Sequence, residues 1–445
     1  MPILAAEKTK RRFHPVSAPD YLPVEQLRDL QLSRLQATVS RAYERVQLTR
    51  DRMNRLGLRP EHIRSLDDLR RLPFTMKSDL RDAYPYGLFA VPLRDIVRLH
   101  ASSGTTGKPI VVAYTQDDLN VWTSVMARAL ASFGIDRDDI FQNAHGYGLF
   151  TGGLGFHYGL EALGVTVVPM SGGSTDRQIM IMKDFQVTSV CATPSYFVHM
   201  LERAAEMGID VRELPLRTGG FGSEPWSESM RRHIESAAGI KAYDCYGLSE
   251  MTGPGVGAEC WFQHGPHIFE DHFYPEIIDP DTGENLPDGA EGELVVTSLS
   301  KQAMPLIRYR TRDLTAIQPE PCPCGRTLRR IRRIGRRTDD MLIIRGVNLY
   351  PSQIESALLA VEGTLPHYQI ILTREKGLDQ VEVQVEVTPE VFGDRIRALV
   401  ELNEKLTRAI ESAVGLRVAV SLVEPHSIQR SEGKAKRVID RRGEK

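Results

Sequence analysis

Ser102-Ser-Gly-Thr-Thr-Gly-Lys-Pro109 is the stretch from which the fold and chemistry of this chain can be predicted. It lies between two short β-rich runs, residues 95–100 and 110–114. Its glycines can adopt backbone angles that turn successive N–H groups inward, and such amides form a nest for an anion. Four hydroxyl groups and one lysine add donors for phosphate oxygens. The spacing differs from the Walker pattern G-x-x-x-x-G-K-S/T, so we expect a phosphate-binding loop of another type, with an ordinary polar turn as the alternative.

The sequence around this loop alternates short β-rich runs with amphipathic stretches. Residues 165–169 and 187–191 are rich in valine, whereas residues 117–133 and 176–185 have helical spacing. Such alternation predicts a mostly parallel α/β core. Upstream, apolar side chains recur at helical spacing over residues 25–54, which predicts a helical N-terminal region.

The pattern changes near residue 335. A short apolar run, Met341–Arg345, precedes a predicted helix that begins near Pro351, and two β-like runs and a long helix follow. These elements form a small α+β unit of about one hundred residues, within the usual size range of a domain. We therefore divide the chain into a large N-terminal domain, residues 1–335, and a smaller C-terminal domain, residues 336–445.

Composition and charge narrow the classes of function. The chain has 445 residues, of which 41% are apolar and 26% charged, as in a folded protein of more than one domain. The formal net charge is −2, and the arginine-rich stretch 326–337 is mixed with apolar residues, so we expect no nucleic-acid partner. The sequence has no recognisable secretory signal or long apolar span, and five cysteines are an odd number for a disulfide framework. We therefore expect no membrane partner and a cytoplasmic location.

Four further motifs follow the phosphate-binding loop in order. They are Tyr246-Gly-Leu-Ser-Glu250, Tyr309-Arg-Thr-Arg-Asp-Leu314, Arg337-Thr-Asp-Asp-Met-Leu-Ile-Ile-Arg-Gly346 and Ser431-Glu-Gly-Lys434. Together the five motifs resemble those of the adenylate-forming superfamily, and within it the chain most closely resembles the phenylacetate–CoA ligases. The segments shared with that family are Ala101–Lys108, Gly146–Gly155, Gly253–Val256, Glu270–Glu276 and Gly346–Asn348. The resemblance covers almost the whole chain.

The resemblance implies a fold and a reaction. The fold is α/β, with a large N-terminal adenylate-forming domain and a smaller, mobile C-terminal α+β domain. The reaction joins an aromatic carboxylic acid, phenylacetate or a close relative, to coenzyme A, and ATP is cleaved to AMP and pyrophosphate through an acyl-adenylate. The family also implies a homodimer. Indoleacetate or an amino- or hydroxybenzoate as the acid, a carrier protein as the acceptor, and a non-catalytic nucleotide-binding regulator are the alternatives.

The same resemblance assigns residues to catalysis and to Mg²⁺. Lys434 corresponds to the catalytic lysine that the small domain carries in, with Lys436 as a nearby rival. Glu250 is the implied Mg²⁺ ligand, Ser249 is expected to hydrogen-bond the α-phosphate, and Asp339 falls at the hinge position.

A further set of residues is implied to bind ATP. These residues are Ser102, Ser103, Gly104, Thr105, Thr106, Gly107, Lys108, Gly222, Ser223, Glu224, Tyr246, Asp313 and Arg337. The chain departs from the family at Arg336, where a glycine is usual, and at Gln429, where proline is frequent. The first departure concerns the backbone beside Arg337, and the second concerns the loop that carries the catalytic lysine.

The acid is expected near the glycine-rich segment after residue 144. The predicted pocket residues are His145, Tyr147, Phe150 and Gly219. Tyr147 and Phe150 would supply aromatic walls, and glycines would leave room for a flat ring. Phenylacetate ligases often have tyrosine where this chain has His145, and an imidazole is smaller and can donate or accept a hydrogen bond. An acid larger or more polar than phenylacetate is therefore an open alternative.

Cys322-Pro-Cys-Gly325 resembles a zinc knuckle. Cys260 and His267 could complete a tetrahedral set with Cys322 and Cys324. The histidines that compete for the fourth position are His264 and His272. Zinc held by four protein ligands would be structural, because no coordination position stays open. The alternative is a turn with two cysteines and no metal.

Overall fold

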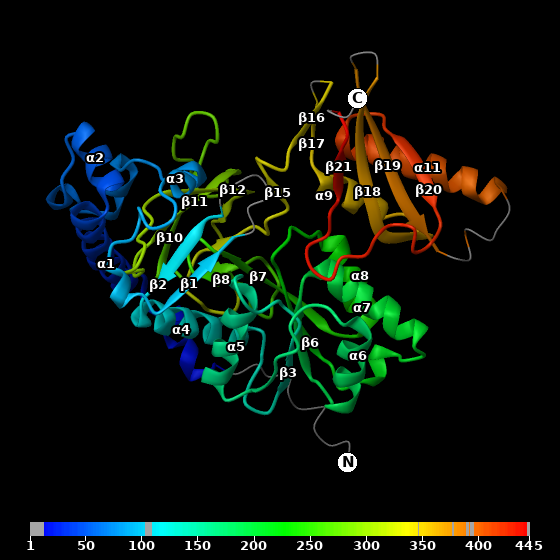
Figure 1. Cartoon of the computed structure of the whole chain (residues 1–445), viewed down its shortest axis with the longest axis horizontal. Coiled ribbons are helices and arrows are strands. Elements are labelled where there is room, and N and C mark those ends of the chain that lie inside the picture. Colours follow the sequence, from blue (N-terminus) through cyan, green and yellow to red (C-terminus); the bar gives the residue numbers. More distant parts are fainter. Residues whose placement is uncertain are drawn as a thin grey trace.

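The chain folds into a larger N-terminal unit and a smaller C-terminal unit. The structure is a computed structural model that describes residues 13–102, 109–345, 347–375, 378–388, 391 and 396–442. Figure 1 shows the smaller unit, coloured from yellow through orange to red, above helices α7 and α8 of the larger one. The predicted domain boundary at residue 335 stays a prediction.

A nine-stranded sheet forms the centre of the larger unit, with the strand order β13-β14-β9-β8-β7-β6-β5-β3-β4. Its strands are β3 (Ile140–Asn143), β4 (Thr166–Val168), β5 (Ser189–Ala192), β6 (Thr218–Phe221), β7 (Lys241–Leu248), β8 (Gly253–Ala258), β9 (His267–Ile268), β13 (Ile317–Gln318) and β14 (Arg330–Ile331). Strands β3 to β7 pair in parallel, and the remaining neighbours pair antiparallel. The parallel half matches the α/β pattern predicted from the sequence.

Helices cover both faces of this sheet. They are α4 (Gln116–Ser132), α5 (Gly152–Leu163), α6 (Thr175–Asp184), α7 (Pro194–Glu206) and α8 (Glu228–Ala238). Side chains of a strand alternate between faces, and in β5 Cys191 joins the core with α4 and α5, whereas Val190 and Ala192 join the core with α6, α7 and α8. The sheet is therefore buried on both sides, as a parallel sheet requires.

Helix α4 illustrates how local sequence sets these elements. The Thr115 side chain accepts from the backbone N–H of Asp118 over 3.2 Å, and the Asp118 carboxylate accepts from the N–H of Thr115 over 2.9 Å. This reciprocal cap satisfies two backbone donors at the helix start. Trp122 and Met126 lie one turn apart and are both buried, which fixes the face that packs on the sheet.

Smaller elements flank the central sheet. They are α1 (Val24–Arg45), α2 (Gln47–Arg55), α3 (Lys77–Asp82), the hairpin β1 (Arg98–Ala101) and β2 (Val111–Tyr114), and the antiparallel sheet β10 (Phe273–Ile278), β11 (Gly292–Ser298), β12 (Tyr309–Thr315) and β15 (Arg336–Arg337). The sequence predicted a helical region over residues 25–54, and the structure divides this region into two helices at Val46. That residue has extended backbone angles and a buried side chain, so α1 ends there and α2 begins in a new direction.

The C-terminal unit has a core of its own. Its elements are the hairpin β16 (Leu342–Ile344) and β17 (Val347–Leu349), α9 (Pro351–Leu358), β18 (Thr364–Glu375), β19 (Leu378–Val387), α11 (Ile396–Val414), β20 (Ala419–Val423) and β21 (Val438–Asp440). Four strands pair in the order β20-β19-β18-β21. Apolar side chains of α9 and α11 pack on this sheet in a cluster separate from the cores of the larger unit.

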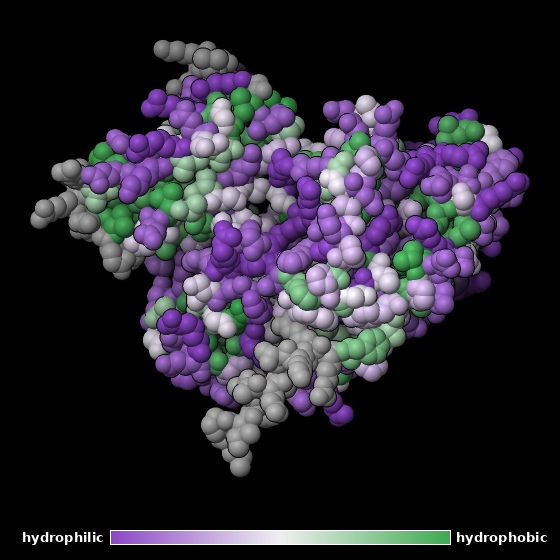
Figure 2. Space-filling view, turned by 180° about the vertical axis from the view of Figure 1, so that it is seen from behind, coloured by the Kyte–Doolittle hydropathy of each residue, from purple (hydrophilic) through white to green (hydrophobic). Residues whose placement is uncertain are grey.

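No helix among the described residues is long and apolar enough to cross a membrane. The face of the molecule opposite to that of Figure 1 is mostly hydrophilic, and hydrophobic residues gather there only in small patches (Figure 2).

Candidate active site

A cavity of about 140 Å³ lies beside the carboxyl ends of β6 and β7. In open parallel sheets this edge is where ligands bind. The cavity brings together residues predicted for ATP and for catalysis, namely Gly222, Ser223, Glu224, Tyr246, Asp313, Arg337, Glu250 and Lys434.

Asp313 is the centre of a buried hydrogen-bonded group in this cavity. The Tyr246 hydroxyl donates to Asp313 Oδ2 over 2.6 Å, and the Arg337 guanidinium donates to Oδ1 over 2.7 Å. Asp313 lies opposite Arg337 in the pairing of β12 with β15, which explains how the guanidinium reaches it. Burial raises the pKa of Asp313, while the charge of Arg337 acts in the opposite direction. A carboxylate has about four lone-pair sites, so acceptor capacity remains for two ribose hydroxyls.

The segment after β6 approaches β7 closely. A Cβ on Gly222 would lie 2.5 Å from the carbonyl oxygen of Cys245, so a side chain there would force the segment away. Ser223 has a φ of 69°, a left-handed conformation that is uncommon outside glycine. Gly222, Ser223 and Tyr246 line the same space, the cavity beside β6 and β7.

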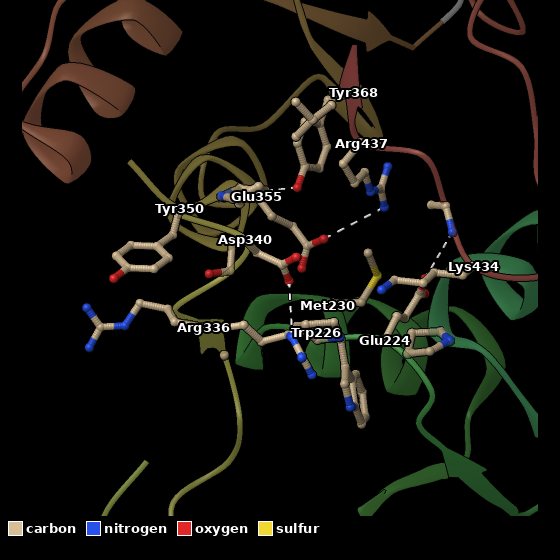
Figure 3. Close-up of a pocket in the computed structure, with 18 of the residues that line it drawn as sticks. Glu224, Trp226, Met230, Arg336, Asp340, Tyr350, Glu355, Tyr368, Lys434 and Arg437 are labelled. Atoms are coloured by element: carbon tan, nitrogen blue, oxygen red, sulfur yellow. Dashed lines mark hydrogen bonds and ion pairs between the residues drawn. The ribbon is translucent and has the colours of Figure 1, made fainter. Parts of the chain in front are cut away.

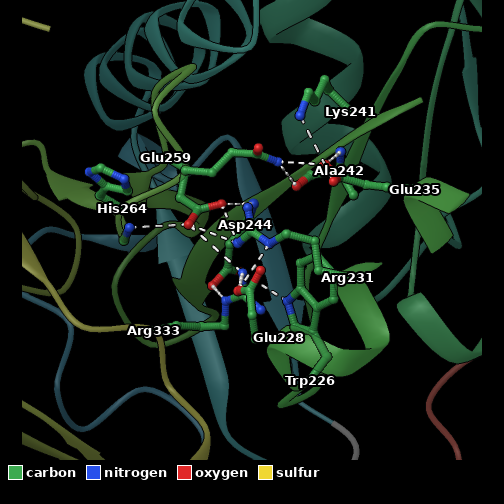
Figure 4. Close-up of polar contacts among 12 residues, drawn as sticks. Trp226, Glu228, Arg231, Glu235, Lys241, Ala242, Asp244, Glu259, His264 and Arg333 are labelled. Carbon is green, nitrogen blue, oxygen red and sulfur yellow. Dashed lines mark hydrogen bonds and ion pairs between the residues drawn. The ribbon is translucent and has the colours of Figure 1, made fainter. Parts of the chain in front are cut away.

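A buried charge network supports the wall behind that space (Figure 4). Trp226 donates from its ring N–H to Asp244 over 3.3 Å, and the backbone N–H of Asp244 donates to Glu259 over 2.8 Å. Arg231 donates to both oxygens of Glu259 over 2.8 Å. Burial and the nearby charge of Glu259 raise the pKa of Asp244 to about 7. The network fixes Trp226 and Asp244, which both line the cavity.

Glu250 presents its carboxylate to the same cavity. Its side chain is 8% exposed, and Lys77 Nζ lies 3.7 Å from Oε1. Lys301 donates to the main-chain oxygens of Glu250 and Met251 over 3.3 and 2.5 Å, and burial lowers the pKa of Lys301 to about 8. The Ser249 hydroxyl lies 3.1 Å from that of Thr151. A carboxylate oxygen in a cavity wall is a ligand type that suits Mg²⁺ together with phosphate oxygens and waters.

Lys434 reaches this cavity from the C-terminal unit. The hydroxyls of Thr193 and Ser195 donate to the carbonyl oxygen of Gly433 over 2.9 and 3.3 Å. Glu224 accepts from the backbone N–H of Ala435 over 3.1 Å. The peptide groups on both sides of the lysine are therefore bound to the larger unit.

A second cavity, of about 280 Å³, lies between the two units and meets the first at Lys434 and Glu224. Figure 3 shows Tyr368, Arg437 and Glu355 on one side of it and Trp226 on the other. The Arg437 guanidinium lies 4.4 Å from the centre of the Tyr368 ring and 3.7 Å from the Glu355 carboxylate. The walls of this second cavity therefore combine aromatic rings with side chains of both charges.

Most of the predicted phosphate-binding loop lies outside the described residues. The residues left out are Ser103, Gly104, Thr105, Thr106, Gly107 and Lys108. Gly346, the last residue of the motif Arg337–Gly346, also lies outside the described residues. The stem is described, because the N–H of Ser102 donates to the carbonyl of Ile110 over 2.9 Å at the end of the β1–β2 hairpin.

His145 and Tyr147 lie in the segment between β3 and α5. His145 is 7% exposed and stacks on Phe156 at 5.4 Å between ring centres. Burial lowers its pKa to about 4, so the imidazole is neutral at pH 7. Tyr147 accepts from Asn143 over 2.8 Å and contacts a ring nitrogen of His157 at 3.1 Å.

The other two predicted pocket residues lie in different surroundings. Phe150 is 50% exposed. Gly219 is buried in β6, and a Cβ there would lie 2.4 Å from the Phe221 ring. The structure therefore does not bring all four residues to one enclosed wall.

The four predicted zinc ligands are close together. The ligand atoms of Cys260, His267, Cys322 and Cys324 all lie within 4.8 Å of one another. Cys260 Sγ lies 3.6 Å from Cys322 Sγ, and Cys324 Sγ lies 3.5 Å from His267 Nε2. A tetrahedron with ordinary Zn–S and Zn–N bonds has edges of about 3.8 and 3.5 Å. The spacing fits zinc and is too long for a disulfide.

The surroundings of the cluster separate the rival histidines. His267 Nδ1 lies 3.1 Å from the carbonyl of Leu328, which orients Nε2 toward the sulfurs. His272 instead contacts Ser300 at 2.8 Å, and His264 is not part of the cluster.

Sequence reasoning missed several residues of the cavity, and four of them carry polar side chains that face the predicted site residues. These four are Lys77, Asp244, Tyr309 and Thr311. Asp244 stands two positions before Tyr246 on β7, and Thr311 two before Asp313 on β12, so strand alternation could have identified both. Lys77 comes from α3, far away in the sequence, and no local signal marks it.

Comparison with known proteins assigns the chain to a family. The AMP-binding enzyme family model matches residues 46–303, and the model of the AMP-binding enzyme C-terminal domain matches residues 346–442. Phenylacetate-coenzyme A ligase of Thermus thermophilus is 50% identical over 435 residues, which cover 95% of this chain and 98% of that protein. Phenylacetate-coenzyme A ligase of Pseudomonas putida is 50% identical over 424 residues, which cover 94% and 95%. The chain belongs to the phenylacetate–coenzyme A ligase family of AMP-binding enzymes. This confirms the predicted fold class and makes the chain an AMP-forming acid–coenzyme A ligase.

A solved ligase indicates how the two units of this family member are arranged. A 2-hydroxyisobutyryl-CoA ligase in its postadenylation state, with 2-HIB-AMP, matches with a TM-score of 0.90 at 30% identity over 97% of this chain and 95% of that one. The same ligase in its thioesterification state matches with a TM-score of 0.70 at 31% identity over 95% and 91%. The arrangement of the units here is thus closer to that of the postadenylation state.

Proposed function

We propose that this acid–coenzyme A ligase activates phenylacetate or a closely related aromatic acid. The observation that carries the proposal is one cavity in which Lys434 of the small unit joins Glu250, Asp313 and Arg337 of the large one. The acid carboxylate attacks the α-phosphorus of ATP, the bond to pyrophosphate breaks, and an acyl-adenylate forms. The sulfur of coenzyme A then attacks the acyl carbon and AMP leaves.

The charge of the reactants decides what the cavity must supply. A carboxylate has to approach a triphosphate, and Lys434 is the cation that lowers this repulsion between the acid and the α-phosphate. Glu250 would hold Mg²⁺, and the bound ion would offset the charge of the phosphate oxygens. The phosphate-binding loop, residues 102–108, would hold the β- and γ-phosphates.

The remaining cavity residues orient the nucleoside. Asp313 accepts from the ribose hydroxyls. The charge of Arg337 favours the ionised form of Asp313 against the effect of burial, and its guanidinium reaches toward the ribose. Adenine lies between Tyr246 and the backbone of Gly222 and Ser223. Asp339, paired with Arg337 at 2.9 Å, is the proposed hinge of the small unit.

His145 supports a specific substrate hypothesis. It is buried and neutral, so it can pair with a polar group on the acid. Pairing with a buried polar partner discriminates strongly, whereas one extra apolar group changes selectivity by about 1–3 kcal/mol. The test measures AMP release and kcat/KM for phenylacetate, indoleacetate and 2-aminobenzoate in the wild type and in His145→Tyr.

We expect turnover of at least one of these acids and a change of ranking in the variant. If no aromatic acid releases AMP, the proposed substrate class is wrong. If the wild type prefers phenylacetate and His145→Tyr keeps the ranking, His145 does not select the substrate. Phenylacetate is then the substrate that the data support.

We also propose that Cys260, His267, Cys322 and Cys324 hold a structural zinc ion. The spacing of the ligand atoms and the orientation of His267 support it. A homodimer and a cytoplasmic location remain further proposals that rest on the family.

A further inference from the structure

Glu202 is an acidic side chain on α7 that faces the C-terminal unit. His367 Nε2 lies 2.6 Å from its Oε1, and Arg430 Nε lies 3.2 Å from its Oε2. The side chains of Glu202, His367 and Arg430 are 20%, 7% and 11% exposed. One carboxylate of the larger unit therefore holds two side chains of the smaller unit in largely buried contacts.

Arg430 is itself fixed within the smaller unit. Its two terminal nitrogens donate to the oxygens of Glu386 over 2.6 and 2.8 Å, and Glu386 is fully buried. The guanidinium thus lies between Glu386 of its own unit and Glu202 of the other.

The chain that follows Arg430 carries Lys434. Three residues lie between Arg430 and Lys434, so their Cα atoms are at most about 14 Å apart. Glu202 holds one end of this segment through Arg430, and Glu224 holds the other end through the N–H of Ala435. The segment also lies close to the larger unit between these ends, because a Cβ on Gly173 would lie 2.8 Å from the Glu432 carboxylate.

The electrostatics favour an ionised Glu202 in this arrangement. Burial acts to raise its pKa, but the hydrogen bond from His367 and the nearby charges of His367 and Arg430 bring the pKa below its ordinary value. Burial lowers the pKa of His367, while its hydrogen bond with Glu202 and the charge of that carboxylate act in the opposite direction. The carboxylate would lose both partners if the smaller unit moved away.

We propose that Glu202 is a positioning residue for the adenylation half-reaction, which it serves by docking the segment that carries Lys434. The inference rests on the proposed function, since adenylation is the step in which Lys434 is assigned a role. The aligned ligase differs between its postadenylation and thioesterification states, and this chain resembles the former more closely. Glu202 is therefore expected to matter for forming the acyl-adenylate and not for transfer to coenzyme A.

The experiment compares both half-reactions in Glu202→Gln, Glu202→Asp and a matched control, Glu206→Gln. Glu206 is one helical turn further along α7 and pairs with His426 at 3.3 Å, but the two side chains are 41% and 59% exposed. Acid-dependent ATP–pyrophosphate exchange reports adenylation, and thioester formation from supplied acyl-adenylate reports transfer. Hydrogen exchange of residues 428–437 reports docking without reference to activity.

We expect Glu202→Gln to slow pyrophosphate exchange by more than about tenfold, since one partner of a buried ionic contact is removed. Transfer should stay within about twofold, Glu202→Asp should recover part of the loss, and Glu206→Gln should change little because exposed pairs contribute little. Faster hydrogen exchange over residues 428–437 in Glu202→Gln alone completes the expected result.

Two results would overturn the inference: unchanged pyrophosphate exchange in Glu202→Gln, or equal loss of both half-reactions. Failure of the proposed function is distinguishable from these. A wild type that adenylates no aromatic acid would remove the function, while hydrogen exchange of the segment would still decide whether Glu202 docks it.

Discussion

Replacement of Asp313 by asparagine should separate nucleotide binding from stability. Asp313 is buried, with its oxygens bound to Tyr246 and Arg337 at 2.6 and 2.7 Å. Asparagine has the same shape but keeps only one acceptor oxygen for the ribose hydroxyls. A hydrogen bond to a charged group contributes about 1.5–3 kcal/mol, so the KM for ATP should rise by roughly 10- to 100-fold.

The free energy of unfolding of Asp313→Asn should rise or stay unchanged, although its binding of ATP weakens. Burial raises the pKa of Asp313, which means that the folded site disfavours the ionised form relative to the unfolded chain. A carboxyl with a raised pKa binds more protons in the folded state, so ionisation costs stability as pH rises above its ordinary pKa. A neutral amide removes that cost, although Arg337 then loses one of its partners and keeps Asp339.

The assay measures initial rates of AMP release against ATP concentration, and thermal unfolding of the same samples. Asp340→Asn is the matched control, because Asp340 lies 3.8 Å from the same guanidinium and its side chain is 44% exposed. An Asp313→Asn enzyme with a KM for ATP within about twofold of the wild type would refute the role in ribose binding. A similar rise in KM in the control would refute it equally, since the effect would then belong to Arg337.

Three further predictions concern zinc, His145 and the metal ligand. The purified protein should contain one zinc per chain, and Cys322→Ser should lose it with a lower unfolding temperature, whereas Cys245→Ser should keep it; elemental analysis and calorimetry check this. Because the pKa of His145 falls from an ordinary 6.5 to about 4 on folding, the wild type should lose about 2 kcal/mol more stability than His145→Asn between pH 7 and pH 5, in urea titrations. Glu250→Gln should weaken Mg²⁺ dependence and reduce adenylation by about a hundredfold or more, and a normal Mg²⁺ titration would contradict the assignment.

The sequence predicted the helices and strands whose positions depend on local sequence pattern. Helix α4 has its cap at Thr115 and a buried face at helical spacing, and the structure begins the helix one residue before the predicted start. The strands β4 and β5 lie within or beside runs rich in valine, whose branched side chains suit a sheet buried on both faces. The break at Val46 was not predictable in this way, because the apolar spacing continues through it.

Candidate site residues could be predicted where they belong to sequence motifs. Residues that only the tertiary structure brings to the site could not. Asp313 and Arg337 come from separate motifs, and the pairing of β12 with β15 brings them together. Lys77 and Glu202 belong to no motif. Lys77 lies near Glu250, and Glu202 near His367, only in the folded protein, so the sequence does not show that either residue belongs to the site. Gly219 was predicted for the acid pocket, but it lies against Phe221: a Cβ on Gly219 would be 2.4 Å from the Phe221 ring.

The most direct measurement of the central claim separates the two half-reactions in Lys434→Ala. The account predicts that the variant loses aryl-acid-dependent ATP–pyrophosphate exchange, because Lys434 is the cation between the acid and the α-phosphate. The same variant should still convert supplied phenylacetyl-adenylate and coenzyme A to the thioester at a rate close to that of the wild type. Equal loss of both steps, or pyrophosphate exchange at the wild-type rate, would contradict the account.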